Sequence, residues 1–182
     1  KPNNRCLYVK TNLSATMACL FDCVLVSGTY SDDLGDYRPG LEAAADLGVR
    51  HTFVEAGMDM SAVRAVAREL ALSDLAELPA SPCLSSRVET GIPIDPGVLG
   101  AIDCAERLVR RELKPETARC RVRGEAIVIE LDPHSLAAMD DETAEQLQRE
   151  TGSLLAAAGV PHPVIFAGYR MGSAFLRPTD EA

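Results

Sequence analysis

The sequence predicts an α/β protein in which a parallel sheet occupies the first half and a smaller α+β unit the second. In the first half, apolar runs of strand length alternate with helical segments. In the second half, a helix, a hairpin, another helix and a strand follow one another. The chain has 182 residues, of which 47% are hydrophobic, so it can bury the core of one domain or two small ones. We place the domains at residues 1–88 and 89–182.

The first half is expected to begin without regular structure and then to alternate helices with strands. Asn12 can cap a short helix that runs to Leu20. Residues 23–26 form an apolar run typical of a parallel strand that is buried on both faces. The next elements expected are a helix over residues 41–47 ended by Gly48, a strand over 49–55, a helix with a packed apolar stripe over 60–72 and a helical turn over 74–78.

A polar loop follows the first predicted strand, at the end where open α/β sheets bind ligands. Glycines allow a backbone to approach a ligand closely, and aspartates can bind Mg²⁺ or ribose hydroxyls. A solvated turn is the alternative interpretation. The candidate nucleotide-binding residues are Gly28, Thr29, Asp32, Asp33 and Arg38, and Asp33 is also a candidate metal ligand.

The stretch around Cys83 concentrates a thiol, two hydroxyls and a guanidinium in one loop. Prolines at 79 and 82 keep this chain out of a helix interior. A cation such as Arg87 lowers the pKa of a nearby thiol, and Ser85 and Ser86 can hold an anion beside it. The loop is therefore a candidate for a reactive cysteine next to an anion site, with Ser85, Ser86 and Arg87 as candidate phosphate ligands. The alternative is an ordinary buried cysteine in a turn.

In the second half, Asp95 is expected to cap a helix that starts at Pro96 and ends at Leu113. Two strands, residues 118–123 and 126–131, then form a hairpin around a two-residue turn. A helix over 141–158 and a strand over 163–168 complete the unit, with its helices expected on one face of an antiparallel sheet.

Three arginines alternate along the first hairpin strand, so Arg119, Arg121 and Arg123 share one face. They form either a solvated face paired with local carboxylates or a phosphate clamp, to which arginine geometry is suited. Glu130, on the partner strand, is a salt-bridge partner or a metal ligand. Tyr169 and Arg170 follow the last strand and either bind an anion or cover the end of the sheet.

Composition restricts the function classes. The net charge of −9 and the scarcity of aromatic residues argue against nucleic-acid binding. The six cysteines, without a signal peptide or a membrane-length apolar run, indicate reduced thiols in a cytoplasmic protein without a membrane partner. We expect a small-molecule substrate and a homo-oligomer.

Several blocks of the chain together resemble one family. They are Asn4-Arg5-Cys6, Gly28-Thr29, residues 32–40 (DDLGDYRPG), Pro79-Ala80-Ser81, residues 83–87 (CLSSR), Arg121-Val122-Arg123, Gly168-Tyr169-Arg170 and Gly172-Ser173. The succession resembles the ATP-dependent sacrificial sulfur transferases of the LarE type, which help to build the nickel-pincer nucleotide of lactate racemase. The resemblance extends over nearly the whole chain, and the blocks at 32–40 and 83–87 are long and family-specific.

The resemblance implies a partial adenine-nucleotide alpha-hydrolase-like, Rossmann-like fold of the pyrophosphatase-loop superfamily, with ATP and Mg²⁺ as cofactors. It implies that ATP adenylates a carboxylate of a pyridinium mononucleotide, that Cys83 displaces AMP, and that elimination leaves a thiocarboxylate and dehydroalanine. Cys83 falls on the sacrificial position, Arg121 and Arg123 on substrate-phosphate ligands, and Glu130 on an acidic site residue. A functional link to other nickel-pincer enzymes follows.

Two departures from the family matter. The family's Ser-Gly-Gly-x-Asp-Ser phosphate loop is not in this sequence, so the chain alone is not expected to hydrolyse ATP. Some relatives hold an iron–sulfur cluster through Arg-Cys-x-x-Cys-Lys, but Val9 replaces the second cysteine here, so no cluster is expected. The alternatives are another adenylating enzyme, such as a tRNA thiolase or amide ligase, and a truncated fragment that binds a nucleotide or supports oligomerisation without turnover.

Overall fold

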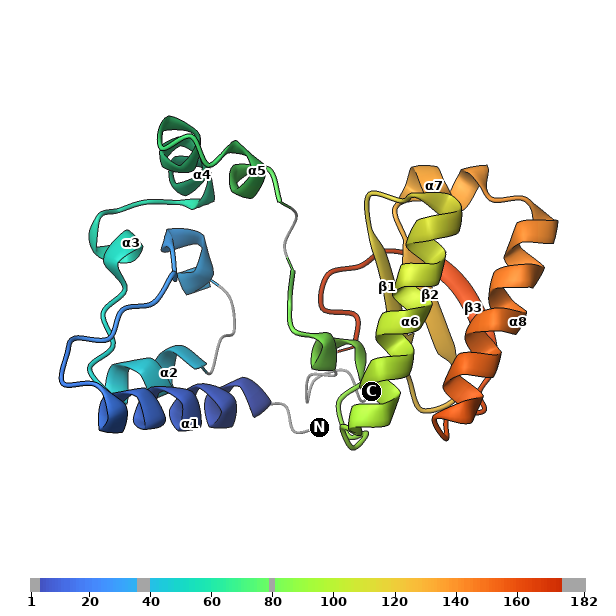
Figure 1. Cartoon of the computed structure of the whole chain (residues 1–182), viewed down its shortest axis with the longest axis horizontal. Coiled ribbons are helices and arrows are strands. Elements are labelled where there is room, and N and C mark those ends of the chain that lie inside the picture. The colour runs from blue at the N-terminus through green and yellow to red at the C-terminus, as the bar shows by residue number, and fades with distance from the viewer. Residues whose placement is uncertain (1–3, 36–39, 79–80, 175–182) are drawn as a thin grey trace. The chain divides into compact units, whose positions relative to one another are not determined.

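The computed structural model describes residues 4–35, 40–78 and 81–174. The fold is mixed α/β, as predicted, and the chain divides into two compact units, Asn4–Ser81 and Pro82 onward (Figure 1). This division falls between residues 81 and 82, whereas the sequence prediction placed it between 88 and 89.

The N-terminal unit consists of helices joined by loops. Helix α1 (Arg5–Leu20) packs against α2 (Gly40–Asp46); they are drawn in dark blue and cyan in Figure 1. The other helices are η1 (Ser31–Gly35, a 3-10 helix), α3 (Thr52–Glu55), α4 (Met60–Glu69) and α5 (Ser73–Ala76).

Helix α1 begins at Arg5, so the prediction of irregular chain before Asn12 is wrong. None of its side chains is fully buried, and its apolar residues are spread around the helix. A helix without an apolar stripe lacks the periodicity by which a sequence reveals it. The helices expected over 41–47, 60–72 and 74–78 are confirmed as α2, α4 and α5, with shifted ends.

The two parallel strands expected in the first half do not form. Val26 and Arg50 make a single parallel bridge, with hydrogen bonds of 2.9 Å from Ser27 N to Arg50 O and from Arg50 N to Leu25 O. Val24 and Val26 are 66% and 62% exposed instead of buried. A strand of this kind needs neighbours on both edges and cover on both faces, and the described residues supply one bridging segment only.

The apolar stripe of α4 is present but not packed as predicted. Val66 and Leu70 are 46% and 66% exposed, and no α4 residue is fully buried. Its N-terminus is nevertheless well capped, because the Asp59 carboxylate accepts a hydrogen bond from Ala62 N at 2.7 Å.

The C-terminal unit is a three-stranded sheet with helices packed on it. The order is β1-β2-β3, with β1 (Ala118–Val122) antiparallel to β2 (Ile127–Leu131) and β2 parallel to β3 (Val164–Gly168). The sheet is therefore mixed and not antiparallel, because α8 (Asp141–Ala157) carries the chain back between β2 and β3. The remaining helices are η2 (Leu84–Arg87, a 3-10 helix), α6 (Pro96–Leu113) and the unpredicted short α7 (Pro133–Ala138).

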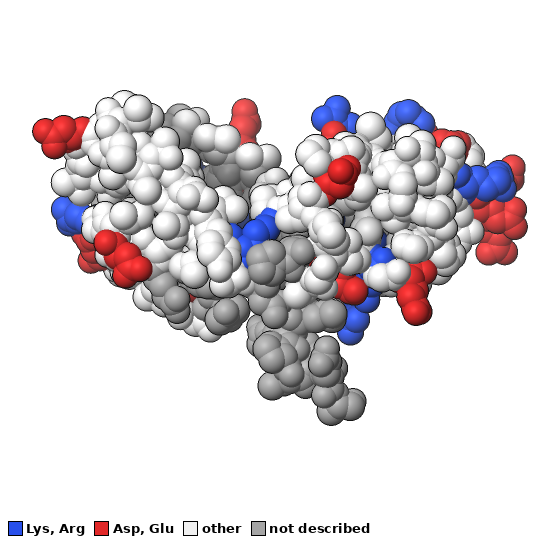
Figure 2. Space-filling model, turned by 90° about the horizontal axis from the view of Figure 1, so that it is seen from below, with Lys and Arg blue, Asp and Glu red and all other residues white. Residues whose placement is uncertain are grey.

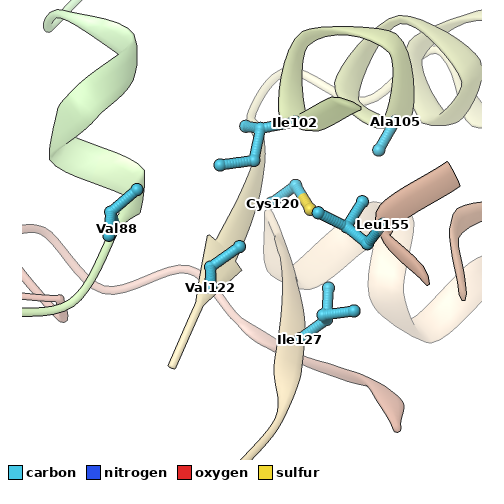
Figure 3. Close-up of a cluster of buried hydrophobic side chains, with 7 residues drawn as sticks. All are labelled: Val88, Ile102, Ala105, Cys120, Val122, Ile127 and Leu155. Atoms are coloured by element: carbon cyan, nitrogen blue, oxygen red, sulfur yellow. The ribbon is translucent and has the colours of Figure 1, made fainter. Parts of the chain in front are cut away.

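The core of this unit lies between the sheet and helices α6 and α8. Ile102 and Ala105 of α6 meet Leu155 of α8 and the inward-facing residues of β1 and β2 (Figure 3). All seven members of this cluster are at most 2% exposed. They are Val88, Ile102, Ala105, Cys120, Val122, Ile127 and Leu155. Alternation along β1 consequently sends its arginines to the opposite face of the sheet.

The outer edge of β1 is covered by the segment that follows Cys83. Val88 bridges Val122 in parallel, and Glu89 N donates to Val122 O at 2.9 Å. The end of the described chain is tied to the same segment, because Thr90 N donates to Ala174 O at 3.0 Å. These bonds bring η2, β1 and the residues after β3 together.

Asp95 caps helix α6 as predicted, and its removal should be measurable. Its carboxylate accepts hydrogen bonds from Gly97 N at 2.8 Å and Val98 N at 3.0 Å. Asp95→Ala leaves both donors without this partner, so we expect the unit's free energy of unfolding to fall by about 1 kcal/mol in urea denaturation. Asp95→Asn, which can cap equally well, should behave like the unsubstituted protein; an equal loss in both variants would contradict the capping role.

Charged side chains are dispersed over the face shown in Figure 2, with acidic and basic residues on both units. Within the described ranges, no helix is long and apolar enough to cross a membrane.

Candidate active site

Cys83 lies at the start of η2 in the C-terminal unit, with its side chain exposed. Its backbone is extended (φ −53°, ψ 145°), and its carbonyl accepts a hydrogen bond from Ser86 N at 2.9 Å. The sulfur lies 3.4 Å from Ser85 Oγ. The turn therefore presents an accessible thiol with a hydroxyl beside it, in contrast to the buried loop cysteine that was the alternative prediction.

The buried side chain of Arg87 stabilises this turn through hydrogen bonds. The side chain is 5% exposed, and its Nε and Nη2 donate to the two carboxylate oxygens of Glu106 at 2.8 and 3.1 Å. Its Nη1 donates to Pro82 O at 2.9 Å and to Ser86 Oγ at 3.2 Å. These bonds occupy four of the five N–H groups of the guanidinium. The predicted role of Arg87 as a phosphate ligand would have to be served by the fifth.

Glu106, on α6, was not singled out from the sequence. It is 3% exposed and also accepts from Arg110 Nη2 at 2.8 Å and from Cys120 N at 3.0 Å, an N–H on the outer edge of β1. Burial alone would raise the pKa of Glu106, but the hydrogen bonds and charges of Arg87, with Cys120 N and Arg110, together lower it. The carboxylate is thus charged at neutral pH, and its contribution to stability is lost as the pH falls through this lowered pKa.

On the other face of the sheet, Arg121 and Arg123 share one carboxylate. Arg121 Nε lies 3.0 Å and Arg123 Nη2 3.3 Å from the oxygens of Glu130, which also accepts from the Ser173 hydroxyl. Glu130 is 1% exposed. Of the two roles considered for Glu130, the described contacts are those of a salt-bridge partner.

Arg121 also joins the Cys83 turn to the end of the sheet. Its Nη1 and Nη2 lie 3.4 Å from the carbonyl oxygens of Ser86 and Arg170. The structure thus brings the predicted site residues of this unit together, with Arg170 placed by its carbonyl oxygen and Tyr169 by its contact with Arg119. They are Cys83, Ser85, Ser86, Arg87, Arg121, Arg123, Glu130, Tyr169 and Arg170.

Arg119 lies over the Tyr169 ring, with its guanidinium carbon 5.9 Å from the ring centroid. Burial first, and then the positive charge of Arg87, lower the pKa of Arg119. The side chain is therefore in a partly desolvated position among other cations, where a bound anion would be favoured.

Cys120, in contrast to the exposed Cys83, has the environment of an unreactive thiol. It is 1% exposed, and burial, assisted by the Glu106 charge, raises the pKa of Cys120 to about 12. The thiolate is the nucleophilic form of cysteine, so Cys120 is a core residue and not a nucleophile.

In the N-terminal unit, the predicted nucleotide-binding residues follow the Val26–Arg50 bridge. Thr29 is buried, and its hydroxyl lies 3.0 Å from Ser27 Oγ, which in turn lies 2.6 Å from His51 Nδ1. Gly28 is exposed beside them. The role of Gly28 and Thr29 in nucleotide binding stays a prediction.

The two described aspartates of this loop accept hydrogen bonds from backbone N–H groups. Asp32 accepts from Met60 N at 3.0 Å at the start of α4, and the buried Asp33 accepts from Tyr30 N at 3.3 Å. Arg38 lies outside the described residues.

The metal site assigned to Asp33 and Glu130 also stays a prediction. The two residues belong to different units, and both oxygens of Glu130 already accept hydrogen bonds from protein donors. The described part of the chain contains no group of three or more His, Cys, Asp or Glu side chains placed to hold a metal ion. We therefore assign no chemical step to a metal bound at these residues.

The geometry defines a class of protein: a mixed α/β protein with an exposed cysteine beside buried arginine–glutamate pairs. No protein-family model matches the chain. The chain is 34% identical over 139 residues to an uncharacterized protein of Synechocystis sp.. The aligned stretch is 74% of this chain and 51% of that protein.

The chain is also similar to a protein of named activity. It is 32% identical over 127 residues to pyridinium-3,5-bisthiocarboxylic acid mononucleotide synthase of Lactiplantibacillus plantarum, over 68% of this chain and 45% of the synthase. The chain thus spans about half the length of the curated relatives it matches. This partial similarity supports the resemblance to the LarE type drawn from the sequence.

Proposed function

We propose that this chain forms the sulfur-donating part of an ATP-dependent transferase that converts a carboxylate of a pyridinium mononucleotide to a thiocarboxylate, toward a nickel-pincer nucleotide. The observation that carries the proposal is the exposed thiol of Cys83 on a turn whose residues Pro82 and Ser86 are bound by the buried guanidinium of Arg87. The similarity to the Lactiplantibacillus plantarum synthase supports the substrate class.

The proposed reaction uses the sulfur of Cys83 once. ATP converts the substrate carboxylate to an acyl-adenylate and releases pyrophosphate. The Cys83 thiolate attacks the acyl carbon, and AMP leaves with the electron pair of the broken bond. A proton is then lost from the Cα of Cys83, the freed electrons form a Cα=Cβ bond, and the Cβ–S bond breaks. The substrate leaves as a thiocarboxylate, and residue 83 becomes dehydroalanine.

The charges around Cys83 suit an anionic substrate. Arg87 and Arg110 pair with Glu106, Arg121 and Arg123 pair with Glu130, and the guanidinium of Arg119 is within electrostatic reach of Arg87 and Glu106, so five guanidiniums accompany two carboxylates. In a chain with a net charge of −9, this is a local excess of positive charge. Arg119, Tyr169 and Arg170 are proposed to meet the phosphate of the mononucleotide, together with the predicted ligands Arg121 and Arg123.

The Ser85 hydroxyl, 3.4 Å from the sulfur, is placed to hydrogen-bond Cys83 in its thiol or thiolate form. In the N-terminal unit, Gly28, Thr29, Asp32 and Asp33 are proposed to contact ATP, which enters with Mg²⁺ as a substrate. The cytoplasmic location, the homo-oligomeric state and the link to other nickel-pincer enzymes remain part of the proposal.

Intact-protein mass spectrometry tests the proposed sulfur donation. The whole gene product is weighed before and after incubation with ATP, Mg²⁺ and the carboxylated pyridinium mononucleotide. We expect a loss of about 34 Da, the mass of H₂S, that peptide mapping places at Cys83.

Two other outcomes would contradict the proposal. Thiolated product with an unchanged protein mass would mean that the sulfur comes from another source. An unchanged mass without thiolated product, while pyrophosphate is still released with another acceptor, would favour a different adenylating enzyme.

A further inference from the structure

Among the described contacts, the side chain of Arg87 binds the turn that carries Cys83 on both sides of the cysteine, whereas Arg121 reaches it at Ser86 O alone. Nη1 of Arg87 reaches Pro82 O, in the peptide before Cys83, and Ser86 Oγ, three residues after it. The hydrogen bond from Ser86 N to Cys83 O closes the turn between these two points. One nitrogen atom therefore holds both ends of the arc that presents the thiol.

We infer that Arg87 and Glu106 are positioning residues, which hold the Cys83 turn in the conformation from which its sulfur is transferred. The inference rests on the proposed function for what the turn does. It assigns a role to Glu106 that the proposed reaction does not use.

Glu106 fixes Arg87 relative to two regular elements. It belongs to α6, and its oxygen Oε1 accepts at once from Arg87 Nε and from Cys120 N of β1. The side chains of Arg87 and Glu106 are only 5% and 3% exposed, so the pair has little water to compete for its hydrogen bonds. The position of the turn is thereby set by the packing of α6 against β1.

The geometry of the guanidinium makes this role specific to arginine. Two parallel N–H groups face Glu106 while a third nitrogen points to the turn. A lysine ammonium carries the same charge but is a single point, and it cannot bind a carboxylate through two nitrogens and reach Pro82 O through another. Arg87→Lys therefore keeps the charge beside Cys83 and removes the bridge.

Arg110 provides a matched control. It also binds Glu106, at 2.8 Å, but its other described hydrogen bond goes to Ala118 O at 3.2 Å and not to the turn. Arg110→Lys perturbs the same carboxylate without removing a hydrogen bond from the turn.

Amide hydrogen exchange of the whole gene product tests the inference without turnover. In Arg87→Lys, we expect exchange of the peptide containing Ser86 and Val88, whose amides bond within the turn, to accelerate about tenfold. In Arg110→Lys, the same peptide should exchange as in the unsubstituted protein. A single-turnover assay should show a roughly 10- to 100-fold slower formation of dehydroalanine in Arg87→Lys, with pyrophosphate release retained.

The outcomes separate this inference from the proposed function. Unchanged exchange of the turn in Arg87→Lys, or equal acceleration in both variants, would overturn the positioning role. Loss of pyrophosphate release in Arg87→Lys with unchanged exchange would make Arg87 a substrate ligand instead. If the unsubstituted protein forms no dehydroalanine, the proposed function fails, and the exchange comparison still decides whether Arg87 holds the turn.

Discussion

Replacing Cys83 with alanine in the whole gene product is expected to abolish sulfur transfer while pyrophosphate release from ATP continues. The physical reason is the order of the proposed steps, in which the thiolate acts only after the carboxylate has been adenylated. Cys83 is exposed and lies outside the buried core, so the substitution should not disturb folding. The measurement is a paired assay of pyrophosphate and of thiocarboxylate product in single turnover.

Cys104→Ala is the control for this prediction. Cys104 is an exposed thiol on α6, outside the candidate site, and its replacement should leave both activities as they are. Loss of pyrophosphate release together with sulfur transfer in Cys83→Ala would show that Cys83 acts earlier than proposed. Sulfur transfer by Cys83→Ala at the unsubstituted rate would exclude Cys83 as the sulfur donor.

The C-terminal unit was predictable because its elements carry local signals. Asp95 and Pro96 mark the start of α6, and a short polar turn separates the two strands of the hairpin. Its mixed sheet was not predictable in the same way. Whether β3 joins β2 or β1, and in which direction, depends on how α8 packs, which no residue of β3 encodes alone.

The parallel strands of the first half illustrate the opposite case. The run of residues 23–26 is apolar enough for a buried strand, yet only Val26 is bridged. A parallel strand is stabilised by its neighbours in the sheet and by helices on both faces, so its formation depends on distant parts of a fold. An apolar run can form a buried strand where other strands and helices pack against it, but the run itself does not determine whether those elements are present.

In the candidate site, the sequence was sufficient to predict the chemically distinctive residues but not the partners that hold them in place. The thiol and hydroxyls of the Cys83 stretch stand out in the sequence, whereas Glu106 lies inside a helix of ordinary composition. A signal did exist: Glu106 is four residues after Ile102 and one after Ala105, both fully buried, so it falls within the apolar stripe of α6. A carboxylate on a buried stripe requires a cationic partner, and Arg87 is that partner.

Replacing Glu130 with alanine is expected to destabilise the C-terminal unit more than any other single change considered. Arg121 is 3% exposed, and without Glu130 its buried positive charge would keep, among the described residues, two carbonyl oxygens as partners, each 3.4 Å away. Breaking a buried ion pair from one side costs about 3–5 kcal/mol. Urea unfolding followed by circular dichroism should show this loss. Glu145→Ala, which breaks an exposed pair with Arg149, should leave the unfolding curve nearly unchanged.

A double substitution distinguishes the cost of an uncompensated charge on Arg121 from the cost of losing the packing of the Glu130 side chain. If the cost of Glu130→Ala comes from the uncompensated charge of Arg121, then replacing both partners with apolar residues, as in Arg121→Met with Glu130→Leu, should recover most of the stability, because apolar side chains need no counter-charge. If Glu130 is instead required for the packing of β2, the double variant should be at least as unstable as Glu130→Ala. An unfolding midpoint of Glu130→Ala equal to that of the unsubstituted protein would show that the carbonyls of Ser86 and Arg170 suffice for Arg121 and that Glu130 is available for a ligand.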